Sequence, residues 1–313
     1  MKVIDMHCDT ITRLYHNNKQ GLLDNDGHLD LKKMKSGDYL LQNFALFTNL
    51  KNTSNPFLTV NQYINYYYQE IEKYPDYIKP VFSYQDIIDN MNNNVMSSLL
   101  TLEEGAVVSN DLSLLQHYYR LGVRMITLTW NYENGIGYPN VPKVNTKDGL
   151  TAFGIDYIKE MERLGIIIDV SHLSDAGFYD VYNNTTKPFV ASHSNARSIC
   201  KANRNMTDDM ILKLASRNGV IGINFYSAFL SDNDDGMSYL KDIVKHILYI
   251  RDLAGIDCIG LGSDFDGIDC KLELKDGSGY QMLKEALIDA GLSLEEIEKI
   301  FYKNVLRLYQ EVL

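Results

Sequence analysis

Cysteine is scarce in this chain. Four cysteines, Cys8, Cys200, Cys258 and Cys270, occur among 313 residues, and no CxxC pair is present. This excludes a disulfide framework and a thiolate zinc ribbon. We therefore expect a reducing, cytoplasmic setting, in which Cys200 serves only for packing.

Long apolar runs and basic runs are also absent. No segment approaches the roughly 18 uncharged apolar residues of a membrane span, and the first residues, MKVIDMHCDTITRLY, lack the apolar core of a signal peptide. Lys plus Arg is 30 against 41 Asp plus Glu, which gives a formal net charge of −11. We expect neither nucleic acid nor membrane as a partner, because both are bound by clustered cations.

The composition is that of a folded globular protein. Hydrophobic residues make up 45% of the chain and charged residues 23%, which excludes disordered and collagen-like classes. No repeat, Pro-rich linker or long charge block divides the sequence. We predict a single domain over residues 1–313.

Short apolar segments alternate with longer segments of helical periodicity. Several, such as MITLTW, IIIDVSH and VIGINFY, are nearly continuous apolar runs, as is typical of parallel strands covered on both faces. Eight strands are predicted, at Lys2–His7, Asn43–Thr48, Ser98–Glu103, Arg124–Trp130, Ile166–His172, Phe189–His193, Val220–Phe225 and Cys258–Asp264. Eight strand–helix units predict an α/β fold of the (β/α)8 TIM-barrel type, with an open doubly wound sheet as the alternative.

The segments between the strands contain helix signals. Ser113–Leu121 is followed by Gly122, and Thr151–Leu164 is followed by Gly165, both typical of helix C-termini. The segment Thr53–Tyr84 is rich in tyrosine. We interpret it as a helix that packs on the outside of the barrel, with an aromatic ligand platform as the alternative.

The first predicted strand ends in His7, Cys8 and Asp9. Because side chains alternate along a strand, His7 and Asp9 share one face and can reach one ion, while Cys8 points away. An HxD pair alone is a weak signal.

Other polar residues stand at further strand ends, where barrel enzymes place their active sites. Glu103 and Glu104 end the third strand, and His172 and His193 end the fifth and sixth. For Glu104 we favour a solvated turn. We expect the remaining histidines to be solvent-exposed in loops or on helices: His16, His28, His117 and His246.

Imidazole and carboxylate ligands together suit Zn²⁺, with Mn²⁺, Co²⁺ or Fe²⁺ as alternatives. The five candidate ligands are His7, Asp9, Glu103, His172 and His193. Five protein ligands are more than one catalytic ion can use when it must keep a coordination position open for substrate or water. Two ions about 3.5–4 Å apart with one bridging carboxylate would use them all, and a bridging hydroxide would be the nucleophile.

Two further residues suit the chemistry of such a site. Asp264, in GSDFDG at the end of the eighth strand, is a natural proton shuttle beside the metals, whereas Asp266 fits a turn or helix N-cap better. Arg204, in Asn203-Arg204-Asn205, could hold a carboxylate bidentately. From the sequence alone a surface position is the expected one for Arg204.

The ordered motifs resemble the membrane (renal) dipeptidase family of zinc peptidases, within the amidohydrolase-type metal-dependent hydrolases. The resemblance runs from about Val3 to Tyr309. It is carried by IDMHCDT, LEEGAVVSNDLSLL, YRLGVRMITLTWN, IIDVSHLS, FVASHSNAR, NRN, INFY and GLGSDFDG.

The resemblance implies two zinc ions and a role for each site residue. His7, Asp9 and Glu103 would bind one ion, and Glu103, His172 and His193 the other. The catalytic residues would be Glu103, as the bridging ligand, and Asp264. Arg204 would hold the substrate's terminal carboxylate, and Asp264 would meet the free amino group and move the proton. A homodimer is also implied.

One position departs from the family pattern. Where better-known members have a substrate-contacting histidine after TLT, this chain has Trp130. An indole donates one N–H but cannot act as an acid in the same way. Asn131 or Tyr132 could supply the missing donor, or the preferred substrate differs.

We predict a metallodipeptidase that hydrolyses the amide bond of small dipeptides. The first alternative is a related barrel hydrolase acting on N-acyl amino acids, lactones or phosphoesters. The second is a non-enzymatic protein on a degraded barrel, for which Trp130 is the only indication.

Overall fold

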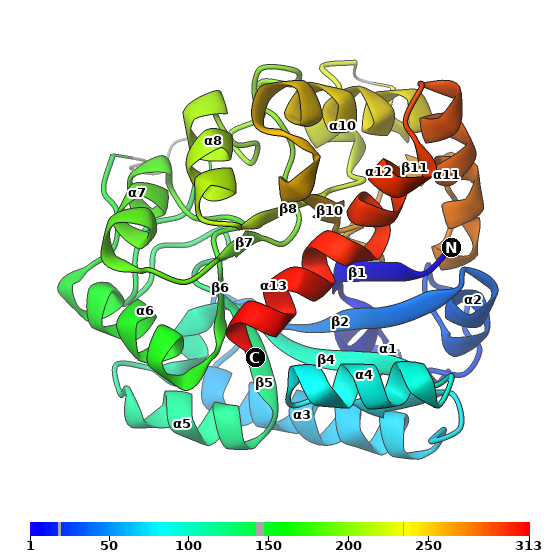
Figure 1. Ribbon diagram of the computed structural model, residues 1–313. Helices are drawn as coiled ribbons and strands as arrows, with labels where there is room; N and C mark the ends of the chain where they lie inside the picture. The colour runs from blue at the N-terminus through cyan, green and yellow to red at the C-terminus, as the bar shows by residue number, and fades with distance from the viewer. Residues whose placement is uncertain (18–19, 142–146, 234) are drawn as a thin grey trace.

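Eight parallel strands close into a barrel in the computed structural model, which describes residues 1–17, 20–141, 147–233 and 235–313 (Figure 1). Strand β2 pairs with strand β4, from Leu41 opposite Ser97 to Phe47 opposite Glu103, and this pairing closes the ring. The barrel strands are β1 (Val3–Cys8), β2 (Tyr39–Phe47), β4 (Met96–Glu103), β5 (Val123–Thr127), β6 (Ile167–Asp169), β7 (Val190–Ala191), β8 (Val220–Ile223) and β10 (Ile259–Leu261). The predicted (β/α)8 barrel is confirmed.

Among the described residues, three short strands lie outside the ring. Strand β3 (Ile78–Pro80) pairs with β4 at the edge of the main sheet. A separate two-stranded ladder joins β9 (Met237–Ser238) to β11 (Lys271–Leu272). These short strands were not predicted, because their sequences, IKP, MS and KL, do not form the apolar runs that mark the barrel strands.

Helices surround the barrel (Figure 1). They are α1 (Thr10–His16), α2 (Leu31–Ser36), α3 (Pro56–Glu72), α4 (Tyr84–Asn92), α5 (Ser113–Arg120), α6 (Ala152–Leu164), α7 (Asp175–Asn184), α8 (Asp208–Ser216), α9 (Ser227–Leu230), α10 (Leu240–Ala254), α11 (Tyr280–Asp289), α12 (Leu294–Glu298) and α13 (Asn304–Val312). Within the described residues, no helix combines the length and apolar character that crossing a membrane requires.

Helix α6 shows how local sequence sets these elements. The Thr151 hydroxyl accepts a hydrogen bond from the backbone N–H of Gly154 and caps the helix start. Gly165 ends the helix in a left-handed conformation, at φ 78° and ψ 34°, which glycine adopts without steric cost. Strand β6 begins at Ile167, one residue after the predicted start at Ile166.

The tyrosine-rich helix α3 packs on the barrel exterior, as predicted. Its buried face includes Val60, Tyr63, Ile64 and Tyr67. The Tyr67 hydroxyl lies 2.7 Å from the hydroxyl of Ser98 on β4. Burial of this face explains the aromatic stripe without a ligand.

The C-terminal helix α13 lies across one end of the barrel (Figure 1). Val305, Leu308 and Tyr309 join the apolar cluster formed by inward-facing strand residues. The buried Tyr309 hydroxyl donates a hydrogen bond to Asn43 Oδ1 at 2.8 Å. This packing fills the N-terminal end of the barrel and leaves the opposite mouth for the site.

Candidate active site

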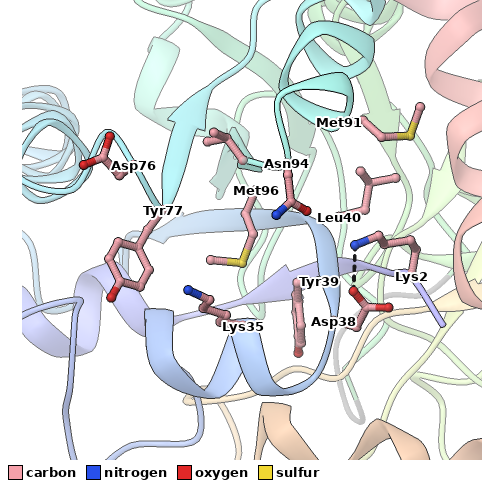
Figure 2. A pocket seen from close by; sticks show the side chains of 11 residues that line it. Lys2, Lys35, Asp38, Tyr39, Leu40, Asp76, Tyr77, Met91, Asn94 and Met96 are labelled. Carbon is pink, nitrogen blue, oxygen red and sulfur yellow. Dashed lines mark hydrogen bonds and ion pairs between the residues drawn. The ribbon is translucent and has the colours of Figure 1, made fainter.

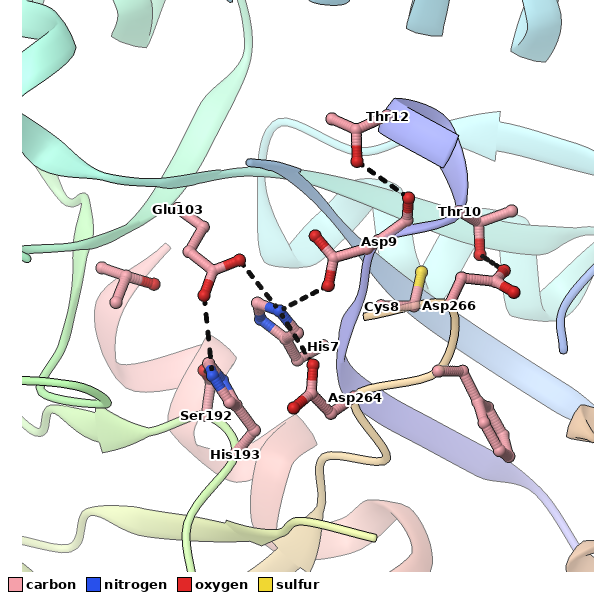
Figure 3. Close-up of polar contacts among 12 residues, drawn as sticks. His7, Cys8, Asp9, Thr10, Thr12, Glu103, Ser192, His193, Asp264 and Asp266 are labelled. Atoms are coloured by element: carbon pink, nitrogen blue, oxygen red, sulfur yellow. Dashed lines mark hydrogen bonds and ion pairs between the residues drawn. The ribbon is translucent and has the colours of Figure 1, made fainter. Parts of the chain in front are cut away.

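The predicted site residues converge at the C-terminal mouth of the barrel, and Figure 3 shows His7, Asp9, Glu103, His193 and Asp264 close together there. His7 lies on β1 and Asp9 follows it, while the Cys8 thiol points away and contacts the backbone oxygen of Asn43. Glu103 is the last residue of β4. Strand alternation therefore places His7 and Asp9 as predicted.

Three further residues lie on loops just beyond their strands. His172 and His193 follow β6 and β7, and Asp264 follows β10. His172 and Asp264 have positive φ angles of 67° and 64°. The strands therefore end before these residues, and the sequence prediction, which extended the strands through them, was wrong at this boundary.

The Glu103 carboxylate lies between the histidines. Its Oε2 is 3.4 Å from His7 Nε2, whereas its Oε1 is 3.2 Å from His172 Nε2 and 3.8 Å from His193 Nε2. His7 Nε2 is also 3.4 Å from Asp9 Oδ2. Each oxygen of one carboxylate thus faces a different set of ligands, which is the arrangement of a bridging ligand.

Two groups of possible metal ligands share Glu103. One contains His7, Asp9 and Glu103, the other Glu103, His172 and His193, and within each group the ligand atoms lie within 4.8 Å of one another. A third combination joins His7 and His193 to Asp264. The sequence-predicted ligand set is therefore spatially coherent.

The unpaired atoms of this cluster fit a bound cation. Both ring nitrogens of His7 and the Oδ1 atom of Asp9 are buried without a hydrogen-bond partner among the described residues. His172 Nε2 and His193 Nε2 are 3.0 Å apart. Buried polar atoms are ordinarily satisfied, and convergent imidazole and carboxylate atoms are the donors that zinc prefers.

Burial and neighbouring charges shift the pKa values of the cluster. Burial raises the pKa of Glu103, but the His7 and His172 imidazoles outweigh it and hold this pKa well below its ordinary value. Burial together with the charge of Glu103 raises the pKa of Asp9 to about 7. This crowding of carboxylates indicates that a cation would stabilise the site.

The two loop histidines are held neutral. Burial, reinforced by the positive charge of Arg204, lowers the pKa of His172 to about 4. Burial also lowers the pKa of His193 well below its ordinary value. Neutral imidazole is the form that binds metal ions.

Asp264 lies at the edge of this cluster. Its Oδ1 is 3.8 Å from His7 Nε2, and its Oδ2 accepts a hydrogen bond from Asn224 Nδ2 at 2.9 Å. Burial raises the pKa of Asp264 to about 6, which suits a group that exchanges protons near neutral pH. Gly267 allows this packing, because a Cβ there would lie 2.2 Å from Asp9 and 2.6 Å from Asp264.

Arg204 is buried, with 7% of its surface exposed, so the expected surface position was wrong. Its guanidinium donates to the backbone oxygen of His193 at 3.1 Å and lies 5.3 Å from the Phe229 ring. Its Nε atom has no hydrogen-bond partner among the described residues. Burial lowers the pKa of Arg204. A buried cation with a free donor suits an anionic ligand.

Trp130 forms part of the cavity wall. Its ring centroid lies 4.7 Å from Phe47, 5.5 Å from Tyr132 and 6.3 Å from His172. The Asn131 Oδ1 atom is 3.0 Å from His172 Nδ1. Of the two replacements considered for the family histidine, Asn131 therefore lines the cavity and contacts a ligand candidate.

Glu104 is fully buried, so its interpretation as a solvated turn was wrong. Its carboxylate accepts hydrogen bonds from the backbone N–H groups of Ala106 at 2.9 Å and Trp130 at 3.2 Å, and from Asn134 Nδ2 at 2.5 Å. Its backbone has φ 108° and ψ 93°. Glu104 thus holds the loop that carries Trp130. Two neighbouring glutamates in a sequence do not reveal this role.

His246 also differs from expectation. It is fully buried on α10, where Nδ1 accepts a hydrogen bond from the Ala196 backbone and Nε2 lies 3.0 Å from the Leu230 oxygen. This histidine connects the loop after β7 to the end of helix α9 (Ser227–Leu230). Asp266 is a turn residue, as favoured, and accepts hydrogen bonds from the Thr10 hydroxyl and the His28 backbone.

A cavity of about 360 Å³ opens over the cluster. Its lining combines acidic and imidazole groups with aromatic side chains, among them Glu103, His172, Asp264, Phe47, Trp130, Tyr226 and Phe229. A neighbouring hollow of about 510 Å³ shares Asp9, Phe47 and Gly267 with it. The volume suits a small substrate rather than a protein chain.

Another cavity lies at the opposite end of the barrel (Figure 2). It has a volume of about 330 Å³ and is lined by residues such as Lys2, Lys35, Asp76 and Met96. Lys2 there pairs with Asp38 at 2.6 Å. This is the N-terminal end of the strands, where barrel enzymes do not place catalysis.

Known proteins share this architecture and sequence. The sequence profile of the membrane dipeptidase family, peptidase family M19, matches residues 1–313. A protein named as a dipeptidase in Schizosaccharomyces pombe is 33% identical over 333 residues, covering 99% of this chain and 80% of its own. Dipeptidase aclJ of Aspergillus oryzae is 30% identical over 317 residues, covering 96% of this chain and 75% of its own.

Solved structures agree with the sequence relatives. The structure of dipeptidase AC, a metallopeptidase of family M19, superposes with a TM-score of 0.93 at 25% identity, covering 100% of this chain and 98% of its own. A metallopeptidase from Rhodobacter sphaeroides, solved with a phosphinate mimic of the dipeptide L-Ala-D-Ala, has the same fold, with a TM-score of 0.92 at 23% identity over 100% of this chain and 99% of its own. The chain therefore belongs to the membrane dipeptidase family, peptidase family M19, and is a metal-dependent hydrolase of peptide bonds.

Proposed function

We propose that this protein is a dinuclear zinc dipeptidase that cleaves the amide bond of small dipeptides. The observation that carries the proposal is the Glu103 carboxylate, whose two oxygens face His7 on one side and His172 and His193 on the other. His7, Asp9 and Glu103 would hold one ion, and Glu103, His172 and His193 the second. Bound there, the two ions would polarise the scissile carbonyl and activate the attacking water.

Arg204 would select the substrate. Its buried guanidinium has no ion pair among the described residues, and a free C-terminal carboxylate would supply the missing partner. Charge-assisted bidentate bonds of this kind are the strong ones. Fixing the carboxylate end would place the scissile amide over the cluster, which restricts the substrate to a short peptide.

Asp264 would carry the proton. It lies beside the candidate ligands and its raised pKa, about 6, allows it to take a proton from water and pass it to the leaving amine. Asn224 holds the carboxylate by one oxygen, which leaves the other toward the cluster. Asp264 would also meet the free amino group of the dipeptide.

The dipeptide substrate is supported by the family and by the dipeptide mimic bound to the Rhodobacter sphaeroides relative. Trp130 bears on the preferred side chains, because with Phe47 it forms an aromatic wall of the cavity. N-acyl amino acids, lactones and phosphoesters remain the alternative substrates, and a substrate panel separates them from dipeptides.

Metal analysis of histidine variants tests the proposal. We expect His172→Ala and His193→Ala each to lose about one zinc per chain and nearly all dipeptide hydrolysis. His117→Ala is the control, because His117 lies half-buried on α5 away from the cluster. Full zinc content and full activity in His172→Ala would overturn the assignment.

A further inference from the structure

Asp169, at the end of β6, is fully buried and accepts four hydrogen bonds. Its Oδ1 accepts from the backbone N–H groups of Ser171 at 3.0 Å and Ser192 at 2.8 Å. Its Oδ2 accepts from the hydroxyls of Thr127 and Ser192, both at 2.6 Å. All four groups, which belong to Thr127, Ser171 and Ser192, are donors, so this carboxylate acts purely as an acceptor.

The hydrogen of the Ser192 hydroxyl is therefore committed. A serine hydroxyl has one hydrogen to donate and two lone pairs, and the hydrogen points to Asp169. His193 Nδ1 lies 2.8 Å from the same oxygen. Because Ser192 can only accept in this contact, Nδ1 must carry the proton of the His193 ring.

The other nitrogen of His193 is then an unprotonated acceptor aimed at the cluster. Nε2 lies 3.0 Å from His172 Nε2 and 3.8 Å from Glu103 Oε1. Figure 3 shows Ser192 and His193 beside Glu103. A lone pair in this place is what a metal ion requires.

The backbone of Ser192 is closely packed. A Cβ at Gly222 would lie 2.0 Å from the backbone oxygen of Ser192, and one at Gly262 would lie 1.8 Å from it. Gly222 lies on β8 and Gly262 follows β10, so the backbone at both places packs directly against Ser192. This packing supports the position from which the Ser192 hydroxyl reaches both Asp169 and His193.

We propose that Asp169, acting through Ser192, is a positioning residue that keeps the proton of His193 on Nδ1 and leaves Nε2 free for a metal ion. The metal-binding part of this inference rests on the proposed function, whereas the position of the proton does not. Asn131 Oδ1 makes the corresponding contact to His172 Nδ1 at 3.0 Å, so the two histidines are oriented by separate partners.

The chain offers a matched control on the other side of the barrel. Asp5 on β1 is also fully buried, and accepts from the Ser263 backbone at 3.0 Å and the Ser263 hydroxyl at 2.6 Å. Ser263 precedes Asp264 and no histidine ring contacts its hydroxyl among the described residues. Ser263→Ala therefore removes an equivalent buried hydrogen bond without touching a histidine proton.

Long-range ¹H–¹⁵N spectra of the metal-free protein, labelled with ¹⁵N-histidine, test the proton position. In the wild type we expect His193 as the Nδ1–H tautomer. In Ser192→Ala we expect Nε2–H at His193 to appear, while His172 stays unchanged. Ser263→Ala should leave both rings as in the wild type, and Ser192→Thr should restore Nδ1–H.

Zinc titration against a competing chelator tests the consequence. Loss of an outer partner of a metal-binding histidine costs about 10–100-fold in metal affinity, and we expect this loss in Ser192→Ala but not in Ser263→Ala. If the spectrum of the wild type shows the His193 ring proton on Nε2 instead of Nδ1, the proposal is overturned, and no variant is needed to decide it. A Ser192→Ala protein with unchanged tautomer and zinc affinity overturns it equally. If the wild type binds no zinc, the proposed function fails, while the spectrum still decides the proton position.

Discussion

Single residues carry the chemistry through their burial rather than their type alone. Arg204 illustrates this, because among the described residues its guanidinium donates hydrogen bonds only to the backbone oxygen of His193 and the hydroxyl of Ser194. Arg197, seven residues before it along the same loop, instead pairs with Asp175 at 2.7 Å. Arg197 thus has a carboxylate partner within the protein, whereas among the described residues Arg204 has none and can bind the carboxylate of a ligand.

We expect Arg204→Ala to lower kcat/KM for a dipeptide with a free carboxylate by about 100-fold, since a hydrogen bond to a charged group contributes about 1.5–3 kcal/mol. Hydrolysis of the same dipeptide with an amidated C-terminus should change by less than about threefold. Arg197→Ala, assayed alongside, should not alter this ratio. Equal losses on both substrates would contradict the role of Arg204.

His246 predicts a pH dependence of stability. Burial lowers its pKa to about 4 in the folded protein, against about 6.5 in the unfolded chain. Between these values the unfolded state binds more protons, so the free energy of unfolding falls as pH drops from about 6.5 to about 4.

Between pH 7.5 and pH 5 the wild type should lose about 2 kcal/mol more of its unfolding free energy than His246→Gln, which does not titrate. Denaturant unfolding of both proteins at several pH values measures the difference. Parallel curves for the two proteins would show that His246 is not the group responsible.

Part of the site was predictable at the residue scale. His7, Asp9 and Glu103 could be placed together because strand alternation and the barrel rule fix where their side chains point. The burial of Glu104 and His246 could not be predicted, since it depends on loops packed from distant parts of the chain. Polar residue types are normally exposed, so the exceptions appear only in the structure.

At the scale of elements, the loops after the strands carry the function. All eight barrel strands were predicted, because each is a run of apolar residues. The C-terminal ends of β6 and β10 were predicted too far along, since His172 and Asp264 adopt positive φ angles that strands do not use. The short strands β7 and β6 end where the ligand-bearing loops begin.

The Glu104 backbone predicts an order of stability among variants. Its positive φ of 108° costs a non-glycine residue about 1–3 kcal/mol, whereas glycine destabilises by enlarging the unfolded ensemble by about 0.4–1 kcal/mol. Glu104→Ala and Glu104→Gly lose the same hydrogen bonds. We expect Glu104→Gly to be the more stable of the two by about 1 kcal/mol in denaturant unfolding. A less stable glycine variant would show that this backbone is not strained.

At the scale of the whole molecule, barrel closure brings together candidate site residues that lie far apart in the sequence. The side chains of His7 and Asp264 are 3.8 Å apart, although His7 lies on the first barrel strand and Asp264 follows the last one. The helix α13 seals the other end through Tyr309 and its neighbours. Single-domain organisation, a cytoplasmic location and a homodimer stay predictions.

Metal removal should therefore weaken the entire fold. A ligand at about 1,000 times its Kd stabilises the folded state by about 4.1 kcal/mol. We expect the unfolding free energy to fall by about that amount for each zinc removed with a chelator, and to return on adding zinc. His193→Ala should show a smaller difference between its zinc-loaded and chelated forms. Identical unfolding of wild type with and without zinc would mean that no tight site exists.

The most direct test is an anomalous-scattering map of zinc-loaded crystals, recorded on both sides of the zinc absorption edge. We predict two peaks at the barrel mouth, each about 2.0–2.2 Å from its nitrogen and oxygen ligands. One should contact His7, Asp9 and Glu103, and the other Glu103, His172 and His193. No peak at the mouth in excess zinc, or a single ion that leaves Glu103 uncoordinated, would contradict the shared-carboxylate centre.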